Sequence, residues 1–202
     1  MIHPSPASSS LSDKDFRDSL RRAALSCREA LPPSEWHRLN ALLVGHLRSL
    51  LERAAPRCLG FCWPYRNEPD LRSLVADWLA GDPSRRAALP VVVAKGEPLV
   101  FVRWSPERAM VADAYGIPVP ESREPCTPDL VLIPLNAFDA AGFRLGYGGG
   151  YFDRTLAALD PAPQTVGVGF ELGRVASIRP QEHDRPLGWI VTEAGAAEAV
   201  KP

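Results

Sequence analysis

Four glycines and two arginines crowd into the stretch RLGYGGGYFDRTL, Arg144 to Leu156. Glycine costs chain entropy on folding, so such a run indicates a place where the backbone approaches another group closely. A glycine run that opens a helix leaves backbone N–H groups unpaired, and anionic oxygens bind to such groups. Asp153 in the same stretch offers a hard oxygen ligand for magnesium. The stretch indicates either a phosphate site or a tight strand-to-helix connection with solvated charges.

This glycine-rich stretch matches neither of the common phosphate-binding motifs. No Lys-Ser/Thr pair follows the glycines, and their spacing does not fit G-x-G-x-x-G. A second basic feature lies near the start of the chain, where Arg17 and Arg21 are four residues apart and share one stripe of a predicted helix. Such a stripe is by itself typical of a solvated helix face. The residue pattern alone leaves phosphate binding and a structural role both open.

The helices and strands that would position these residues alternate along the chain. Helical patterns cover residues 12–31, 35–53, 66–81 and 151–159. The first predicted helix has an inward face formed by Phe16, Leu20, Ala23, Ala24 and Cys27. The second has an inward face formed by Trp36, Leu39, Leu42, Leu43, Leu47 and Leu50. Apolar runs predict strands at 57–65, 86–93, 97–104, 129–138, 164–172 and 187–195.

The order of these elements predicts an α/β fold, a layered open sheet that is mostly parallel, with helices on both faces in a Rossmann-like three-layer arrangement. The strands at 86–93 and 97–104 are expected to form a hairpin through residues 95–97. In an open α/β sheet, ligands bind beyond the carboxyl ends of the strands. Glu68, the glycine stretch and Asp184 all follow predicted strands. We therefore expect them to converge at that edge of the sheet.

The bulk properties restrict the class of protein. The 202 residues carry a formal net charge of −1, so no global basic field favours nucleic acid or an acidic membrane. The apolar runs are too short to span a bilayer. We expect a flexible N-terminal tail over residues 1–12, which lacks the pattern of a signal peptide, and a single domain over residues 13–202. The expected partners are small molecules bound by a monomer.

The four cysteines show no metal-binding pattern. Cys58 and Cys62 have a four-residue spacing, but no second pair and no nearby histidine completes a zinc site. Their segment, CLGFC, is typical of a buried strand in which small thiols pack. Free thiols of this kind predict a reducing, cytoplasmic location.

The segment LIPLNAFDAAGFRLGYGGGYFDRTL closely resembles the signature of 5-formyltetrahydrofolate cyclo-ligases, P-x-x-A-F-D-x-x-G-x-R-L-G-x-G-x-G-Y-Y-D-R. The matching residues are Pro134, Ala137, Phe138, Asp139, Gly142, Arg144, Leu145, Gly146, Gly148, Gly150, Tyr151, Asp153 and Arg154. The similarity extends over nearly the whole chain. RDSLR resembles the family's K-x-x-L-R, WPYRNEPDLRSL its P-x-x-x-E segment, YGIPVP its f-G-I-x-x-P segment, and PQEHDRPLGWIVTEAG its closing segment.

The resemblance implies ATP-dependent closure of 5-formyltetrahydrofolate into 5,10-methenyltetrahydrofolate with release of ADP and phosphate. It implies that Arg144 and Asp153 are catalytic and that Asp153 and Asp184 hold Mg2+. Glu68, Tyr115 and Tyr151 would bind the folate. ATP would be bound by Arg17, Arg21, Arg144, Leu145, Gly146, Tyr147, Gly148, Gly149, Gly150 and Tyr151.

The chain departs from the family pattern at several positions. Arg17 stands for a lysine, Phe152 for a second tyrosine, and Gly173 or Arg174 for an expected glutamine. These departures motivate an alternative, a same-fold paralog that uses ATP on another folate-like or amide substrate. A further alternative is a non-catalytic folate- or nucleotide-binding module. For Glu68, which stands next to a proline, the alternative to folate binding is a helix cap, and His183 is expected to have a structural or supporting role.

Overall fold

The computed structural model describes residues 12–200. Its helices are α1 (Asp13–Glu29), α2 (Pro33–Ala54), α3 (Arg72–Ala80), α4 (Tyr151–Ala158) and the short 3-10 helix η2 (Glu171–Gly173). Its first strands are β1 (Cys58–Gly60), β2 (Arg86–Val91), β3 (Val100–Trp104), β4 (Met110–Ala112), β5 (Pro118–Pro120) and β6 (Leu130–Pro134). The later strands are β7 (Ala137–Phe138), β8 (Arg144–Leu145), β9 (Gln164–Val168), β10 (Trp189–Thr192) and β11 (Gly195–Glu198).

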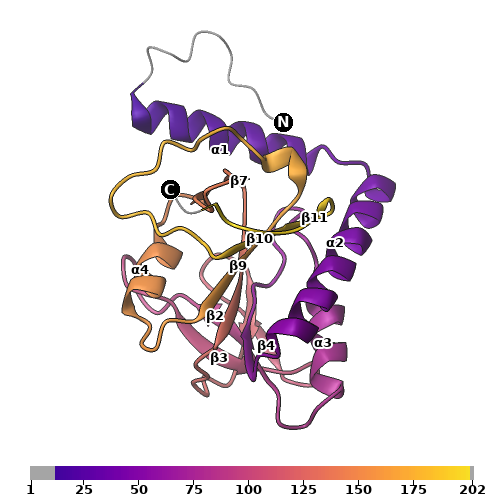
Figure 1. Ribbon diagram of the computed structural model, residues 1–202. Helices are drawn as coiled ribbons and strands as arrows, with labels where there is room; N and C mark the ends of the chain where they lie inside the picture. Colours follow the sequence, from indigo (N-terminus) through magenta and orange to yellow (C-terminus); the bar gives the residue numbers. More distant parts are fainter. Residues whose placement is uncertain (1–11, 201–202) are drawn as a thin grey trace.

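The main sheet has seven strands in the order β11-β10-β9-β6-β1-β2-β3 (Figure 1). The five central strands pair in parallel, and the two edge strands, β3 and β11, pair antiparallel with their neighbours. β2 and β3 form the expected hairpin. The predicted fold class, an α/β layered and mostly parallel sheet, is confirmed.

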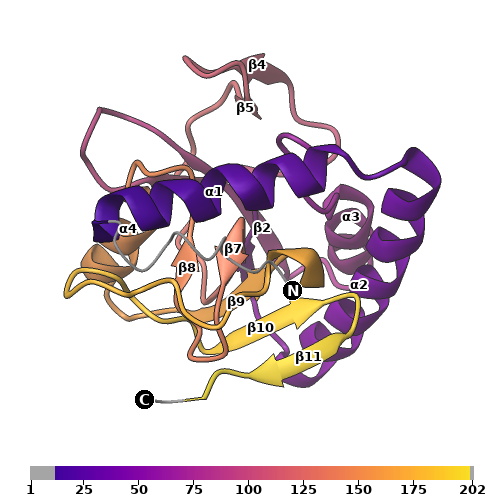
Figure 2. The same cartoon turned by 90° about the horizontal axis from the view of Figure 1, so that it is seen from above.

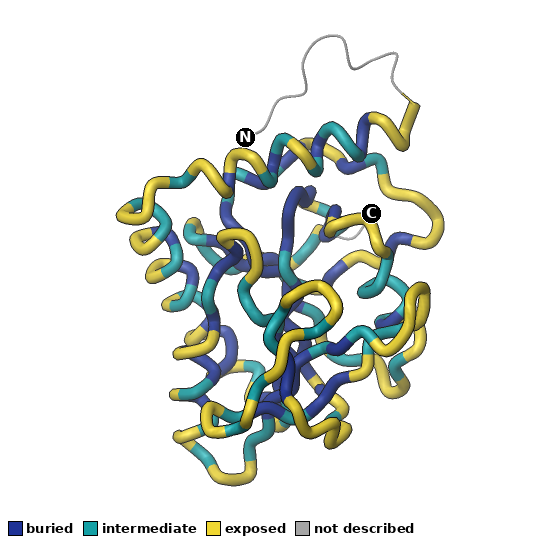
Figure 3. Tube along the Cα trace, turned by 180° about the vertical axis from the view of Figure 1, so that it is seen from behind, coloured by how far each residue is buried: buried dark blue, intermediate teal, exposed yellow. Residues whose placement is uncertain are grey.

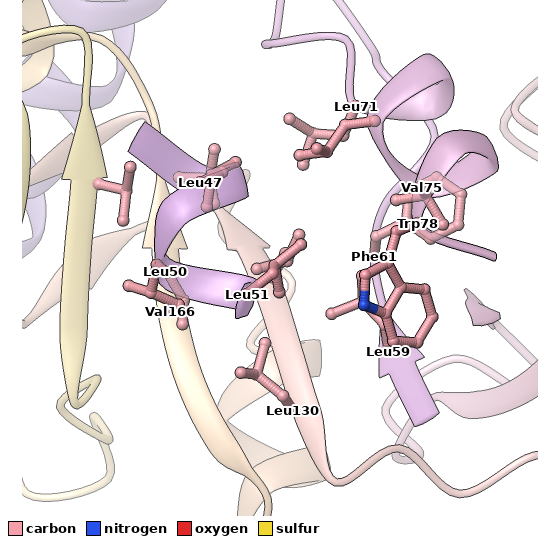
Figure 4. Packing of buried hydrophobic residues seen from close by; sticks show 14 of the residues in the cluster. Leu47, Leu50, Leu51, Leu59, Phe61, Leu71, Val75, Trp78, Leu130 and Val166 are labelled. Carbon is pink, nitrogen blue, oxygen red and sulfur yellow. The ribbon is translucent and has the colours of Figure 1, made fainter. Parts of the chain in front are cut away.

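Both faces of the central strand β6 are buried, as its continuous apolar sequence predicts. Leu130 and Leu132 pack in the cluster under α2 and α3, whereas Val131 and Ile133 pack in a second cluster on the opposite face. Figure 4 shows the first cluster, where leucines of α2 approach the sheet beside the aromatic and aliphatic residues of α3. Apolar side chains of α4 cover the second cluster. The helices thus lie on both faces of the sheet, and buried residues alternate with exposed ones along α1 and α2 (Figure 3).

Helix α1 covers neither face of the main sheet. It crosses the end of the molecule above the strands (Figures 1 and 2) and packs Phe16, Leu20 and Ala24 against the small β7–β8 pair. Because β7 directly follows the carboxyl end of β6, α1 lies over the edge where an α/β sheet binds its ligands. Ser12 accepts a hydrogen bond from the amide of Asp15 and caps this helix. Of the expected tail, residues 1–11 lie outside the described residues.

Several sequence-based expectations are wrong in detail. The strand at 187–195 is followed by one more strand, β11, and the short pairs β4–β5 and β7–β8 were not expected. Cys27, expected on the inner face of the first helix, is exposed, and the neighbouring Arg28 is buried instead. Leu42, expected on the inner face of the second helix, is 44% exposed. A helix face is only about 100° wide, so one position at its border decides between core and solvent.

Leu47 and Leu42, both on α2, provide a matched test of the packing of this core. Leu47 is fully buried between α2 and the sheet, so Leu47→Ala should lower the free energy of unfolding by about 2–5 kcal/mol through lost burial and a residual cavity. Leu42→Ala, on the exposed side of the same helix, should cost less than about 1 kcal/mol. Urea unfolding of both variants measures the difference. Equal losses would contradict the packing of α2 described above.

Candidate active site

A cavity of about 580 Å³ opens at the carboxyl edge of the sheet, beneath α1. Nearly every residue expected at the site lines it, although they come from segments far apart in the chain. The expected residues on its wall are Arg17, Arg21, Glu68, Tyr115, Arg144, Gly146, Tyr147, Gly148, Gly149, Gly150, Tyr151, Asp153 and Asp184. Leu145 is the exception, because its buried side chain packs in the cluster between α1 and the β7–β8 pair.

The glycine loop, residues 146–150, runs from β8 to the N-terminus of α4 with its backbone open to the cavity. Gly148 and Gly150 have φ angles of 92° and 63°, a conformation that side chains rarely adopt. No hydrogen bond found within residues 12–200 uses the backbone N–H groups of the loop. Arg154 donates from Nη2 to the Gly149 carbonyl oxygen at 2.6 Å and holds the far side of the loop. These unpaired amides at a helix N-terminus are suited to an anion.

Arg21 and Arg17 face the cavity from α1 in different states. The Arg21 guanidinium lies under Gly148 and pairs with the half-exposed Asp18, while its buried Nε has no partner in the described part of the chain. Arg17 is buried and donates two hydrogen bonds to Asp184, from Nη1 to Oδ2 at 2.6 Å and from Nη2 to Oδ1 at 3.0 Å. Burial alone would raise the Asp184 pKa, but the hydrogen bonds from Arg17 and from the Gln181 amide, together with the charge of Arg17, outweigh burial, so the pKa lies below its usual value.

A second arginine–carboxylate pair lies beside the first. Arg144 is buried and donates from Nη2 to Asp153 Oδ1 at 3.1 Å and from Nη1 to the Arg185 carbonyl oxygen at 2.8 Å. Burial lowers the pKa of the Arg144 guanidinium, and the negative charges of Asp153 and Asp184 oppose that shift. The cavity therefore combines buried cations and carboxylates on the wall next to the glycine loop.

The two expected metal ligands differ in the oxygens they offer. Asp153 Oδ1 accepts from Arg144 and from the Arg185 amide, whereas Oδ2 has no hydrogen-bond partner among residues 12–200. Both oxygens of Asp184 are occupied by Arg17, and Oδ2 also accepts from the Gln181 amide at 2.7 Å. No cluster of three or more possible metal-ligating side chains occurs in the described chain. This donor set fits a magnesium ion that takes one carboxylate oxygen here and the rest from phosphates and water.

Glu68 lines a second part of the cavity wall together with Tyr65, and it is 4% exposed. Its Oε2 accepts from the Tyr65 amide at 3.1 Å and its Oε1 from the Tyr147 hydroxyl at 2.8 Å. Arg28 Nη2 lies 3.8 Å from Oε1. Burial raises the Glu68 pKa, and Arg28, Tyr147 and the Tyr65 amide oppose the shift. Glu68 does not cap α3, which begins at Arg72 after a non-capping Leu71.

Arg28 is the buried charge that the sequence analysis missed. It follows Arg17 and Arg21 by eleven and seven residues, and these spacings place all three arginines on one stripe of α1. The sequence prediction placed the apolar residue Cys27 on the inner face of the helix, one position before the residue that is buried there. The spacing itself is a signal that identifies Arg28.

Aromatic residues also line the cavity. Tyr115, at the tip of the β4–β5 hairpin, places its hydroxyl 3.2 Å from that of Tyr151 at the start of α4. Trp63 and Phe152 also line the cavity. His183 stands at the rim with a side chain that is 70% exposed, and its Nε2 is 4.0 Å from Asp184 Oδ1. These rings provide flat apolar surfaces next to the polar groups of both walls.

The structure explains why no glutamine side chain stands at Gly173. A Cβ atom at this position would lie 2.4 Å from the Asn136 carbonyl oxygen, so the backbone excludes any side chain. Arg174 turns away, pairs with Glu171 at 2.7 Å and stacks on Phe138. Neither residue lines the cavity.

In the part of the chain that is described, no helix has the length and apolar character needed to cross a membrane.

Comparisons with known proteins point to one family. The sequence model of the 5-formyltetrahydrofolate cyclo-ligase family matches residues 13–193. The chain is 26% identical over 179 residues to the 5-formyltetrahydrofolate cyclo-ligase of Haemophilus influenzae, covering 85% of this chain and 94% of that one. It is 28% identical over 190 residues to that of Mycolicibacterium smegmatis, covering 87% and 93%.

Solved structures agree with these sequence matches. The 5,10-methenyltetrahydrofolate synthetase of Aquifex aeolicus superposes with a TM-score of 0.79 at 27% identity, covering 93% of this chain and 94% of the other. The synthetase of Mycoplasma pneumoniae superposes with a TM-score of 0.71 at 23% identity, covering 88% and 98%, which shows the shared fold.

The buried pair of Arg17 and Asp184 makes a prediction that needs no ligand. Asp184→Asn leaves the Arg17 charge buried without its counter-charge, so the metal-free variant should lose about 3 kcal/mol of unfolding free energy at pH 7. The Asp184 pKa is lowered in the folded state. The contribution of its charge to folding stability is therefore fully present at pH values above the ordinary aspartate pKa of 3.8, and it is lost as the pH falls through the lowered pKa. The gap between wild type and variant should shrink in acid.

Urea unfolding across this pH range measures the effect, with Asp77→Asn as the control. Asp77 forms an exposed pair with Arg48, and its replacement should cost less than about 1 kcal/mol. An Asp184→Asn protein as stable as wild type at pH 7 would show that the pair does not hold α1 in place.

Proposed function

This chain belongs to the 5-formyltetrahydrofolate cyclo-ligase family, and we propose that it uses ATP and Mg2+ to cyclise 5-formyltetrahydrofolate to 5,10-methenyltetrahydrofolate, releasing ADP and phosphate. Membership makes it an enzyme of the folate cyclo-ligase type. The observation that carries the finer proposal is one cavity that is lined both by the unpaired amides of the glycine loop with arginines and by a buried carboxylate with aromatic rings.

The chemistry explains why both walls are needed. The oxygen of a formamide is a poor leaving group, so the proposed reaction first transfers the ATP γ-phosphoryl group to the formyl oxygen. The folate N10 then attacks the same carbon and loses its proton, and the C–O bond breaks as phosphate leaves. Most of the protein's work in such a transfer is positioning and neutralising the charge of the moving phosphoryl group.

The phosphate wall suits ATP because its donors are already in place. The open amides from Gly146 to Tyr151 would hold the phosphate oxygens, with Arg21 beneath the loop. Arg144 is buried at the end of the loop, where a guanidinium can stabilise charge on the transferred group. We assign Arg17 to the same wall, where its pair with Asp184 fixes its position. The Leu145 backbone is the start of this cradle.

Magnesium supplies charge neutralisation of the phosphates when it is bound. Asp153 is the residue that would hold it, through the carboxylate oxygen Oδ2, which accepts no hydrogen bond from the described residues. Each oxygen of Asp184 already accepts from Arg17, so a metal ion on Asp184 would share its oxygen with a cationic guanidinium group. We therefore place Asp153 first in the metal site and keep Asp184 as its second expected carboxylate.

The folate wall suits a pterin. A buried carboxylate such as Glu68 pairs well with a neighbouring amino group and ring N–H, and its charge is not screened by water. Tyr115 and Tyr151 would frame the ring system through their faces. The phosphate-binding residues alone would equally suit a paralog that uses ATP on another substrate. The buried Glu68 carboxylate is the feature that favours a folate.

The direct test is the absorbance of methenyltetrahydrofolate formed from 5-formyltetrahydrofolate, ATP and magnesium. The wild-type protein should form this product only when all three are present. A protein that binds ATP but forms no product would favour the paralog, and one that binds both ligands without any ATP hydrolysis would favour a binding module.

Replacing the proposed metal ligand gives a sharper prediction. Asp153→Asn keeps the size of the side chain but removes its charge, so turnover should fall about tenfold or more while folate affinity stays nearly unchanged. A higher magnesium concentration should restore part of the rate. Turnover measured over a magnesium titration tests this, and full activity of the variant at limiting magnesium would remove Asp153 from the metal site.

Replacing the proposed folate carboxylate should act on the other substrate. Glu68→Gln keeps the shape but loses the charge-assisted part of a hydrogen bond, roughly 1–3 kcal/mol, which corresponds to a folate KM raised about five- to hundred-fold. ATP affinity should stay nearly intact. A variant with a lowered melting temperature and an unchanged folate KM would instead assign Glu68 a purely structural role.

The pH profile adds a second readout for the same residue. Burial raises the Glu68 pKa above its ordinary value of 4.5, and a protonated carboxyl group has lost the charge that pairs with the pterin. Folate affinity of the wild type should therefore begin to fall on acidification at a pH above 4.5. Glu68→Gln should lack this step in a binding titration between pH 7 and pH 5.

A further inference from the structure

The Tyr147 side chain joins the glycine loop to the folate wall. Its backbone lies in the loop between Gly146 and Gly148, and its hydroxyl group contacts residues outside the loop. There it donates to Glu68 Oε1 at 2.8 Å and accepts from Arg28 Nη2 at 2.7 Å. The ring also packs edge-on against Tyr65, with centroids 5.6 Å apart. One side chain thus touches both halves of the site.

Arg28 fixes the direction of this hydrogen-bond chain. It is 3% exposed and its other donors are engaged, from Nε to the Arg66 carbonyl oxygen at 2.9 Å and from Nη1 to Asn136 Oδ1 at 2.7 Å. A guanidinium only donates, so the Tyr147 oxygen must accept from it and pass its own proton toward Glu68. Arg28 does not line the cavity and acts only through its neighbours.

We propose that Tyr147 couples the two substrates, so that nucleotide bound at the glycine loop improves folate binding at Glu68 and folate improves nucleotide binding in return. Tyr147 and Arg28 are positioning residues in this proposal, which rests on the proposed function. The coupling must be reciprocal because it is a difference in free energy between the doubly and singly bound states.

The loop geometry supplies the physical link. Residues 146–149 are exposed, and their amides have no hydrogen bonds within the described chain, so phosphate oxygens would order this backbone. Ordering the backbone on both sides of residue 147 restricts the Tyr147 ring and holds its hydroxyl on Glu68. The carboxylate then needs no reorientation when a pterin arrives, which lowers the cost of binding.

A side chain without a hydroxyl group at position 147 keeps the backbone cradle but cannot contact Glu68 through a hydrogen bond. Substrate binding in such a protein would be independent at the two walls. The Tyr147 hydroxyl is therefore the atom to remove.

The test compares folate affinity with and without a non-hydrolysable ATP analogue and magnesium, by calorimetry on the full chain. In the wild type, the analogue should tighten 5-formyltetrahydrofolate binding about tenfold, since the contact involves a charged partner. In Tyr147→Phe this ratio should fall to about one, while affinity for the analogue alone changes by less than about threefold. Under turnover, the folate KM should rise and kcat should change little.

Thr192→Val is the matched control. Thr192 donates its hydroxyl to Glu171 Oε1 at 2.7 Å, a hydroxyl–carboxylate contact away from the cavity, so its removal should leave the ratio as in the wild type. Melting temperatures of both variants report any general loss of stability. Because Tyr147→Phe keeps the ring on Tyr65, this variant should fold.

The outcomes separate the coupling from the proposed function. A wild-type ratio near one, or the wild-type ratio retained in Tyr147→Phe, overturns the coupling, and normal product formation in the same protein leaves the proposed function intact. A ratio that depends on Tyr147 in a protein that forms no methenyltetrahydrofolate supports the coupling and refutes the reaction. A wild type that binds no 5-formyltetrahydrofolate overturns both.

Discussion

Two buried guanidinium groups on α1 fix the position of this helix over the cavity. Arg17 and Arg28 are 6% and 3% exposed, and removing such charges from water costs several kcal/mol each unless partners replace the lost hydration. Asp184 supplies the partner at one end of α1, and Tyr147, Asn136 and backbone carbonyls supply it at the other. These contacts, eleven residues or about 16 Å apart along the helix, position α1 across the open edge of the sheet.

The position of α1 turns an open sheet edge into a cavity with two walls. The apolar residues between the two arginines pack on the β7–β8 pair, which presents the glycine loop directly under the helix. The loop then leads into α4, which covers the face of the sheet opposite α2 and α3. A shift of α1 would therefore disturb both the cations next to the loop and the carboxylate on the far wall. The site depends on a helix that belongs to neither face of the sheet.

Local periodicity was enough to predict most of the main sheet and the class of the fold. The run around Leu132 is apolar at every position because both faces of β6 are covered. Strands of two or three residues, such as β4 and β7, are too short to show alternation, and GAAE in β11 offers no apolar signal. The walls of the cavity were predictable because motif residues follow strands. The ion pairs between these residues were not predictable, since Arg17 and Asp184 lie 167 positions apart and no local sequence pattern connects them.

The charge balance of the cavity decides which cations are most available to a phosphate. Arg17 uses its planar fork to satisfy both oxygens of Asp184, which the ammonium of the lysine in the family pattern would not do with two parallel hydrogen bonds. Arg21 pairs only with the half-exposed Asp18 and retains a buried donor without a partner in the described residues. An anion at the glycine loop recruits Arg21 at lower cost than Arg17, because moving Arg17 would leave Asp184 buried and unpaired. In the proposed reaction, Arg21 is therefore the phosphate contact of α1 that costs least, and Arg17 holds the helix in place through Asp184.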